Sequence, residues 1–405
     1  MDFEDSPEEA AFRLECRAWL EANARRRTPG SAEVWRTLRP KDEDEDASSM
    51  ALAKRWQILK ADAGFAGIQW PSTYGGRGLS SHLAGVFKQE EANFDVPGNA
   101  FQVAVDMVGP TLIAHGSEEQ KLRHLEPIKR GDEVWCQLFS EPDAGSDLAG
   151  LSTRAELDGD EFVVNGQKVW TSGAQSSDWA ILLVRTNPDE RKHRGITYLL
   201  LDMTTPGIDV RPLRQIDGAV HFNEVFLTDV RVPLKNVVGH IDGGWGVTMT
   251  TLVNERSAIG GGGMIQISEI LNLARQMGRT DDAVFRQRLA KMYTYFQITR
   301  YLGFRVQTSV SQGLQPGPES SVMKLHISRQ YGEGGDLYMA LLGAAAMLSA
   351  DDAPFDGFFQ GLFLSQWAPR IGGGTDQIQR NIAGERVLGL PAEPRVDKDK
   401  PFRLL

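Results

Sequence analysis

The sequence contains little cysteine, no long apolar run and no excess of basic residues. Its two cysteines, Cys16 and Cys136, are too few for a disulfide framework, which suits a reducing compartment. They lie in no Cys/His cluster and the seven histidines are scattered, so we predict no metal site. The net charge of −10 argues against nucleic acid or an anionic membrane as a partner.

No apolar stretch is long enough to span a bilayer, and the acidic, amphipathic N-terminal residues do not resemble a signal peptide. We therefore expect a cytoplasmic protein that neither inserts into a membrane nor binds nucleic acid. A chain of 405 residues can form two or three domains with large cores.

The periodicity of apolar residues changes twice along the chain. Helical spacing marks three segments near the N-terminus, residues 51–63, 83–93 and 111–128. From about residue 134 to 240 the period is two, and β-branched residues mark strands at 181–184, 197–202 and 223–227. Helical patterns return at 246–312, 319–349 and 375–390. The order is therefore helices, then a sheet, then helices.

Residues 135–177 carry the most informative local pattern. Asp158-Gly159 and Asn165-Gly166 supply the positive φ angles that two-residue hairpin turns require, and each follows a strand-like run. We predict an antiparallel meander that returns Trp170-Thr171-Ser172 towards residues 137–140. Periodicity alone would equally allow a plain sheet corner with a buried Trp170.

Four segments resemble the acyl-CoA dehydrogenase family, in the family's order: SEPDAGSD at 140–147, NGQKVWTSGA at 165–174, FNEVFLTDVRVP at 222–233 and GGGTDQIQRNIAGERVLGLP at 372–391. This set is far more specific than a single glycine pattern. The resemblance implies an α+β fold with three domains: an N-terminal helical domain (1–133), a middle β-barrel-like domain (134–245) and a C-terminal four-helix bundle (246–405). It also implies bound FAD and a homodimer or homotetramer.

The resemblance assigns the contacts to the flavin ring to two groups of residues: Leu138, Phe139 and Ser140, and Trp170, Thr171 and Ser172. Ser140 would bond near flavin N5, Trp170 would lie against the ring, and Ser172 would bond the N5 region from the second of these segments. Donors aimed at N5 stabilise the charge that builds up as the ring accepts hydride. Ser172 could also be a plain turn residue.

The dinucleotide half of FAD is expected at the last motif, where we choose Gly374, Thr375 and Gln377. The Arg-x-x-Phe-Gly segment that often binds the pyrophosphate in this family is missing, and ARQMGRTDDAVFRQRLA stands at 274–290. Arg275, Arg279 and Arg286 are the candidates for the arginine. We favour Arg279 because it falls in the expected loop between helices.

The catalytic base must be a carboxylate beside the substrate α-carbon. Many family members carry this glutamate directly before the Gly-Thr of the last motif, where this chain has Gly373. Another branch carries it on the first helix of the C-terminal bundle, where this chain has Glu255 followed by Arg256. We predict Glu255 as the base and Arg256 as the residue that holds structure and polarity around it. Alternatively, both are ordinary surface charges.

The implied reaction is FAD-dependent α,β-dehydrogenation of an acyl-CoA thioester to the trans-2-enoyl-CoA, as in β-oxidation of fatty acids or other lipids. Ser146 resembles the family residue near the thioester end of CoA, although a capping hydroxyl would look the same. An electron-transferring flavoprotein is the expected oxidant. Two rivals remain: a flavin oxidase or monooxygenase on the same fold, and a non-catalytic subunit of a hetero-oligomeric dehydrogenase.

Two glycine runs bear on the acyl chain. Gly260–Gly263 follow Glu255 in an expected helix, where each glycine costs up to about 1 kcal/mol relative to alanine. The family fold places Gly372–Gly374 across the cavity from Glu255. We expect a wide pocket for a branched, long or ring-bearing acyl group, although close packing would explain the glycines equally well.

Overall fold

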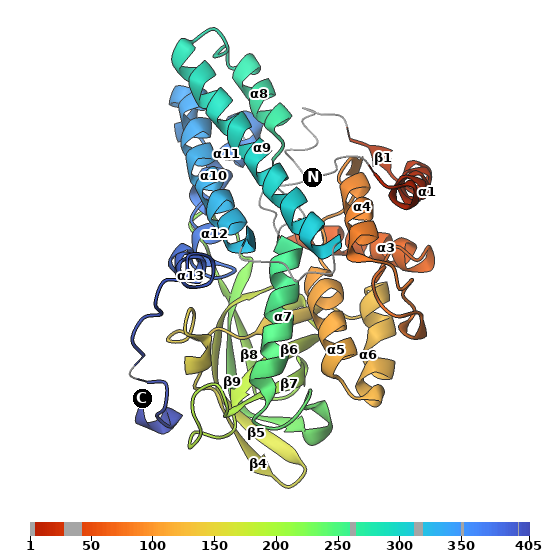
Figure 1. Cartoon of the computed structure of the whole chain (residues 1–405), viewed down its shortest axis with the longest axis vertical. Helices are drawn as coiled ribbons and strands as arrows, with labels where there is room; N and C mark the ends of the chain where they lie inside the picture. Colours follow the sequence, from red (N-terminus) through yellow and green to blue (C-terminus); the bar gives the residue numbers. More distant parts are fainter. Residues whose placement is uncertain (1–4, 28–42, 260–264, 312–318, 350–351, 396) are drawn as a thin grey trace. The chain divides into compact units, whose positions relative to one another are not determined.

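The computed structural model describes residues 5–27, 43–259, 265–311, 319–349, 352–395 and 397–405. The chain divides into two compact units (Figure 1). The sheet unit comprises Glu43–Leu79, Pro97–Ala258 and Glu393–Leu405, and the bundle unit comprises Met1–Asp42, Ser80–Val96 and Ile259–Ala392. The units interleave along the chain, and the three domain boundaries expected from the sequence stay a prediction.

The sheet unit is built on one seven-stranded sheet. Its strands are β3 (Trp135–Leu138), β4 (Arg154–Asp158), β5 (Glu161–Ser172), β6 (Trp179–Arg185), β7 (Ile196–Asp202), β8 (Ile208–Leu213) and β9 (Phe222–Pro233). The strand order is β3-β6-β4-β5-β9-β8, and β7 pairs with β6. The period-two runs predict β6, β7 and β9, and all three are confirmed.

Both faces of the sheet are covered, because alternate residues of one strand enter different cores. Along β6, Ile181 and Leu183 enter one apolar core, and Leu182 and Val184 enter the other. The first core also takes side chains from the helices of this unit: the π-helix η2 (Val103–Val108), α5 (Gly109–His115), α6 (Glu118–Arg130) and α7 (Gly244–Ile259). Figure 1 shows α7 lying across the sheet.

The first predicted turn of the meander is confirmed in place, although Asp158 ends β4 and the loop residues are Gly159 and Asp160. Asp158 pairs with Glu161, and Gly159 takes a φ of 67° in the two-residue loop between them. The second predicted turn, at Asn165-Gly166, is wrong because β5 continues through it to Ser172. A Cβ on Gly166 would lie 2.4 Å from Thr153 Oγ1, so this glycine permits a close approach of two chain segments within a bulge.

The sheet unit also contains α3 (Glu43–Asp62) and short 3₁₀-helices: η1 (Ser72–Tyr74), η3 (Leu148–Gly150), η4 (Ala174–Ser176), η5 (Leu234–Asn236) and η10 (Phe402–Leu404). The helix expected through residues 111–128 is interrupted at Gly116, between α5 and α6. Ser117 begins the new helix, because its hydroxyl accepts from the Gln120 N–H while the Gln120 side chain accepts from the Ser117 N–H.

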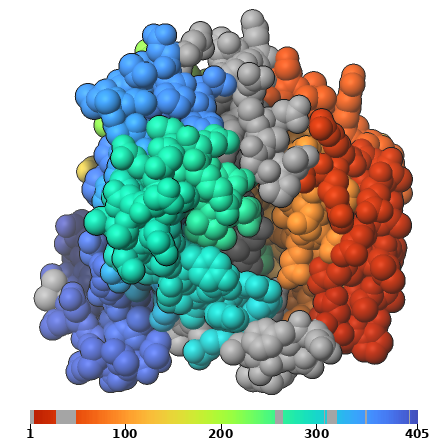
Figure 2. Space-filling view, turned by 90° about the horizontal axis from the view of Figure 1, so that it is seen from above, coloured from red at the N-terminus to blue at the C-terminus, as the bar shows by residue number. Residues whose placement is uncertain are grey.

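The bundle unit combines the first helices with those after residue 259. Its α-helices and strands are α1 (Pro7–Asn23), β1 (Arg25–Arg26), α4 (Ser81–Glu91), β2 (Phe94–Asp95), α8 (Ile267–Gln276), α9 (Ala283–Ser311), α10 (Glu319–Leu342), α11 (Phe358–Ser365), α12 (Ala368–Ile371) and α13 (Asp376–Ile382). Three shorter turns of helix accompany them: η6 (Gly343–Met347), η8 (Pro354–Gly357) and the π-helix η9 (Ala383–Val387). Figure 2 shows α8 and α9 (green to cyan) side by side at the surface of this unit. Helices at both ends of the chain and a sheet in the middle confirm the predicted α+β class.

A helix that crosses a membrane must be both long and apolar. Within the part of the chain that the structure describes, no helix has both the length and the apolar character that crossing a membrane requires.

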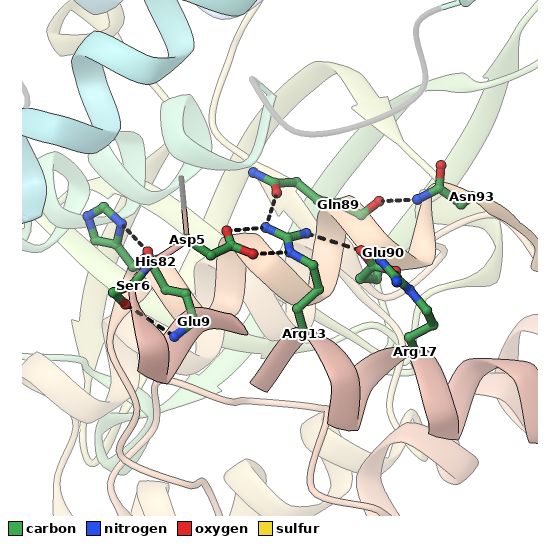
Figure 3. Close-up of polar contacts among 9 residues, drawn as sticks. All are labelled: Asp5, Ser6, Glu9, Arg13, Arg17, His82, Gln89, Glu90 and Asn93. Carbon is green, nitrogen blue, oxygen red and sulfur yellow. Dashed lines mark hydrogen bonds and ion pairs between the residues drawn. The ribbon is translucent and has the colours of Figure 1, made fainter. Parts of the chain in front are cut away.

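Ion pairs fasten α1 to α4 (Figure 3). Glu90 of α4 accepts from Arg13 Nη1 at 3.1 Å and from Arg17 Nε at 3.0 Å, and its side chain is only 5% exposed. Arg13 also donates to Asp5 at 2.6 Å and to Gln89 at 3.0 Å. Burial raises the pKa of Glu90, but the hydrogen bonds from Arg17 and Arg13 outweigh it and leave this pKa below its ordinary value.

Replacing Glu90→Gln removes this charge and should lower the free energy of unfolding by about 1–3 kcal/mol at neutral pH. A carboxylate with a depressed pKa stabilises the fold above its ordinary pKa of 4.5, and this contribution is lost as the pH falls through the folded value. Thermal melts of both proteins should therefore differ by a constant amount above about pH 5 and converge at lower pH.

The matched control is Glu156→Gln, because the Arg154–Glu156 pair is exposed and its atoms lie 3.7 Å apart. This change should alter stability by less than about 0.5 kcal/mol. Equal effects of the two substitutions would show that Glu90 does not fasten α1 to α4.

Candidate functional site

The continuous strand β5 returns to the residues that follow β3. Leu138 is the last residue of β3, and both it and Phe139 are buried. The carbonyl of the next residue, Ser140, accepts a hydrogen bond from the Val169 N–H at 3.0 Å. This confirms the predicted return of Trp170 and its neighbours to the Leu138–Ser140 segment.

A buried ion pair fixes this junction. Lys168 Nζ lies 2.8 Å from Glu141 Oε1 and donates to the Phe139 carbonyl at 3.1 Å, and the two charged side chains are 0% and 4% exposed. Glu141 also accepts from the backbone N–H groups of Ser152 at 2.6 Å and Thr153 at 2.9 Å. Sequence reasoning missed this pair, because a lysine next to an apolar residue is ordinary in a strand whose side chains alternate between two faces.

Burial and pairing act in opposite directions on these two groups. Burial raises the pKa of Glu141, but the charge and hydrogen bond of Lys168 outweigh burial and leave it below its ordinary value. Burial lowers the pKa of Lys168, and Glu141 opposes that change. The pair therefore depends on both partners being present.

Trp170 has an unusual backbone conformation. Its φ is 61°, in the left-handed region that a bulky residue rarely adopts and that costs on the order of 1–3 kcal/mol. A bulge between Lys168 and Thr171 turns the side chain out of the sheet, where it is 62% exposed and meets Phe222 edge-on. The alternative of a buried Trp170 is therefore wrong.

Two buried polar atoms near Trp170 have no hydrogen-bond partner among the described residues. Thr171 is 1% exposed, and its Oγ1 has no hydrogen-bond partner within the described residues. Asn223 donates to the Thr171 carbonyl at 3.0 Å, while its own Oδ1 is buried and likewise unpartnered. Ser172 is exposed. Buried polar groups without partners are rare and costly, and an exposed aromatic face beside them fits a flat, polar-edged ring such as flavin.

Glu255 lies on α7 and is half-buried. Gln137 of β3 donates from Nε2 to Glu255 Oε2 at 3.5 Å, which brings the predicted base to the start of the Leu138–Ser140 segment. The side chain of Arg256 and the whole of Gly260–Gly263 lie outside the described residues.

One turn before Glu255, hydroxyl groups attach α7 to its neighbours. Thr251 is fully buried, and its Oγ1 lies 3.0 Å from Thr111 Oγ1 and 3.1 Å from the Tyr198 hydroxyl. Burial raises the pKa of Tyr198, so this phenol stays neutral at physiological pH. The three hydroxyls join α7 to α5 and β7.

Ser146 is exposed, and the segment that carries it is held by charges. Its neighbour Asp147 pairs with Lys192 at 2.8 Å, and Lys192 also pairs with Asp397 of the C-terminal segment at 2.5 Å. These contacts give Ser146 a defined place on the surface of the sheet unit, and sequence reasoning did not foresee them.

The candidate residues for the dinucleotide lie in the bundle unit. Thr375 caps α13, because its Oγ1 accepts from the Ile378 N–H at 3.2 Å, and Gln377 is exposed. Gly373 and Gly374 have φ values of 64° and 83°. A glutamate at position 373 would therefore be strained, which agrees with the absence of a base there.

The three arginine candidates differ in their surroundings. Arg275 donates to Asn272 Oδ1 at 2.7 Å, and Arg286 is exposed. Arg279 lies just after α8, its guanidinium is 5.4 Å from the centre of the Phe285 ring, and its Nε is buried without a partner among the described residues. This unpartnered donor favours Arg279 over the other two.

A pocket of about 540 Å³ lies elsewhere in the sheet unit, lined by residues that include His115, His240 and Gly246. Gly246 and Glu255 are nine residues apart on α7, about 14 Å along a helix. None of the predicted site residues lines this pocket. Among the described residues, no group of histidine, cysteine and carboxylate side chains could hold a metal ion.

Comparisons with protein-family models and with a curated relative both match acyl-CoA dehydrogenases. Three family models match in order: acyl-CoA dehydrogenase N-terminal domain at residues 6–132, middle domain at 136–230 and C-terminal domain at 242–388. The acyl-CoA dehydrogenase IpdE1 of Mycobacterium tuberculosis is 38% identical over 388 residues, which cover 95% of this chain and 98% of the relative.

Two solved structures are similar over nearly the whole chain. The Tcur3481-Tcur3483 steroid ACAD has a TM-score of 0.80 at 28% identity, and the match covers 97% of this chain and 100% of the other. The ChsE4-ChsE5 complex from Mycobacterium tuberculosis has a TM-score of 0.77 at 29% identity, with the same coverage of both chains.

Replacing Lys168→Met should strand the Glu141 carboxylate in the interior and lower the free energy of unfolding by about 3–5 kcal/mol. Urea denaturation measures this loss. The double variant Lys168→Met/Glu141→Gln should recover part of the loss, because the second change removes the stranded charge.

Lys291→Met is the matched control for the single change. It removes a lysine–glutamate pair with Glu333 whose side chains are 50% and 32% exposed, and it should cost less than about 1 kcal/mol. If Lys168→Met costs no more than this control, the buried pair does not hold the junction.

Proposed function

This chain belongs to the acyl-CoA dehydrogenase family, whose members use FAD to oxidise acyl-CoA thioesters, and we propose that it does so with Glu255 as its catalytic base. Glu255 is a carboxylate that Gln137 brings to the Leu138–Ser140 segment. Gly373, the other position where the family carries a base, has no side chain and a left-handed φ. The contact of Glu255 is the observation that carries the proposal.

FAD supplies the acceptor for the hydride that leaves the β-carbon. The residues proposed to hold its ring are Leu138, Phe139, Ser140, Trp170, Thr171 and Ser172. The unpartnered Thr171 Oγ1 and the exposed Trp170 support this assignment. In the bundle unit, Arg279, Gly374, Thr375 and Gln377 are proposed to contact the dinucleotide half, and the unpartnered Nε of Arg279 supports its role.

Glu255 would remove the α-proton of the thioester while the β-hydride leaves, which gives the trans-2-enoyl-CoA. A carboxylate is a suitable general base for this step. Arg256 would hold the structure around the base, and Ser146 would contact the CoA arm near the thioester. An electron-transferring flavoprotein is the proposed oxidant.

The assembly could contain one kind of chain or two. The homodimer or homotetramer expected from the family is the first candidate. A hetero-oligomer is the second, because one of the similar solved structures is a ChsE4-ChsE5 complex. In either assembly we propose that this chain is catalytic, since it carries Glu255.

Replacing Glu255→Gln keeps the size and polarity of the side chain but removes its ability to accept the proton. Turnover of an acyl-CoA with a dye acceptor should fall by at least ~100-fold. The purified variant should still be yellow and release FAD on denaturation. Near-normal turnover by Glu255→Gln would place the base elsewhere.

We also propose an acyl group that is branched, long or ring-bearing. The similarity to a solved steroid ACAD supports a polycyclic acyl chain, and so do the glycines that follow the proposed base in the sequence. Gly373 and Gly374 also have left-handed φ values, which favour glycine. The conformation of the backbone therefore accounts in part for this glycine pair.

Specificity constants test this proposal directly. We expect kcat/KM for a polycyclic or branched acyl-CoA to exceed that for butyryl-CoA by at least ~10-fold, because a wide pocket leaves a short chain poorly positioned. The same panel with Glu255→Gln controls for background oxidation. A clear preference for butyryl-CoA would refute the wide pocket and leave Glu255 untouched.

A further inference from the structure

Gln137 is a polar residue in an otherwise apolar strand. The strand β3 reads Trp135-Cys136-Gln137-Leu138, and Gln137 is its one residue that is not buried. Side chains alternate along a strand, so Gln137 shares a face with Trp135 and Phe139, which are each 3% exposed. An amide in such surroundings costs free energy unless it has a hydrogen-bond partner. Its partner is Glu255, at 3.5 Å.

Two residues on the Glu255 face of α7 fix this helix to its neighbours. Residues four apart lie on one face of a helix, so Val247, Thr251 and Glu255 form a stripe along α7. Val247 is buried in the apolar core that also contains Trp135 and Phe139. Thr251 bonds to Thr111 and Tyr198. The backbone at Glu255 is therefore well defined, and the contact with Gln137 bears on the direction of its carboxylate.

We propose that Gln137 is a positioning residue that directs the Glu255 carboxylate for removal of the substrate α-proton. This inference rests on the proposed role of Glu255 as the base. The Gln137 Nε2 donor stays on one carboxylate oxygen while the α-proton moves from the substrate carbon to the carboxylate, so no proton is exchanged with the amide. The 3.5 Å separation is longer than the usual 2.9–3.0 Å of such bonds, and catalytic hydrogen bonds commonly shorten when substrate binds.

The chemistry of an amide suits this task. An arginine or lysine in its place would hold the carboxylate more strongly, but its charge would lower the basicity of Glu255. The neutral amide orients the carboxylate with a smaller loss of basicity. Glutamine also fits among Trp135 and Phe139 without bringing a charge into this face of the sheet.

The test compares Gln137→Met, which keeps length but has no donor, with Gln137→Asn, which keeps the amide but is one methylene shorter. With the FAD-loaded enzyme we expect each to lower kcat by about tenfold to a hundredfold while KM stays within about twofold. The kinetic isotope effect of an α-deuterated acyl-CoA should rise, because proton removal becomes slower than the other steps. FAD content should match that of the unmodified protein.

The matched control is Gln167→Met. Gln167 also donates its amide to a glutamate, Glu224 Oε1 at 3.1 Å, but on β5 and β9 rather than beside Glu255. We expect normal kcat and a normal isotope effect from this control. The value of kcat and the isotope effect should therefore both distinguish the Gln167→Met control from the two Gln137 variants.

The outcomes separate this inference from the proposed function. If Glu255→Gln is inactive but both Gln137 variants behave like the Gln167 control, Gln137 does not position the base, and Glu255 keeps its role. If Glu255→Gln is active, both proposals are wrong. A loss of FAD or a raised KM in the Gln137 variants, with an unchanged isotope effect, would assign Gln137 a structural role and overturn the inference.

Discussion

The candidate site depends on the buried ion pair between Lys168 and Glu141. These residues come from separate segments of the chain, and their 2.8 Å contact joins the end of β5 to the residues that follow β3. The pair is fully enclosed, so each charge relies on the other and on the N–H groups of Ser152 and Thr153. Its consequence is geometric, because it holds the segment that leads to the exposed Trp170 beside Phe139 and Ser140. These are residues that we propose to contact the flavin ring.

Much of the fold follows from the sequence, because its signals are local. The two periodicities identify most strands and helices, and Asp158-Gly159 forms the expected turn. Asn165-Gly166 shows the limit of such signals, because this dipeptide lies at a bulge within β5 instead of a turn. There the glycine allows Thr153 to pack closely against the strand. Likewise, the expected helix is interrupted at Gly116 because Ser117 and Gln120 form a capping box that begins α6. The apolar stripe that runs through residues 111–128 does not reveal this interruption.

For the candidate site, the sequence allows predictions only at residues that belong to the four motifs or to the Glu255-Arg256 pair. The motif residues predict the flavin-binding segments and Glu255 as the base, but they do not predict the side chains that contact these residues in the fold. Gln137, Lys192 and the Thr111–Thr251–Tyr198 hydroxyls join residues far apart in sequence, and no local pattern indicates such pairs. What a sequence can supply is a warning, namely a polar residue at an apolar position that needs a partner.

Anaerobic mixing of the purified chain with an acyl-CoA tests the central claim, that this one chain dehydrogenates the thioester itself, most directly. Without an electron acceptor, the flavin absorbance should bleach, and mass spectrometry should find a thioester lighter by two hydrogen atoms. Absence of both signals across short, branched and polycyclic acyl-CoAs would contradict the claim and favour a non-catalytic subunit. Product formation that requires oxygen would instead favour an oxidase or monooxygenase.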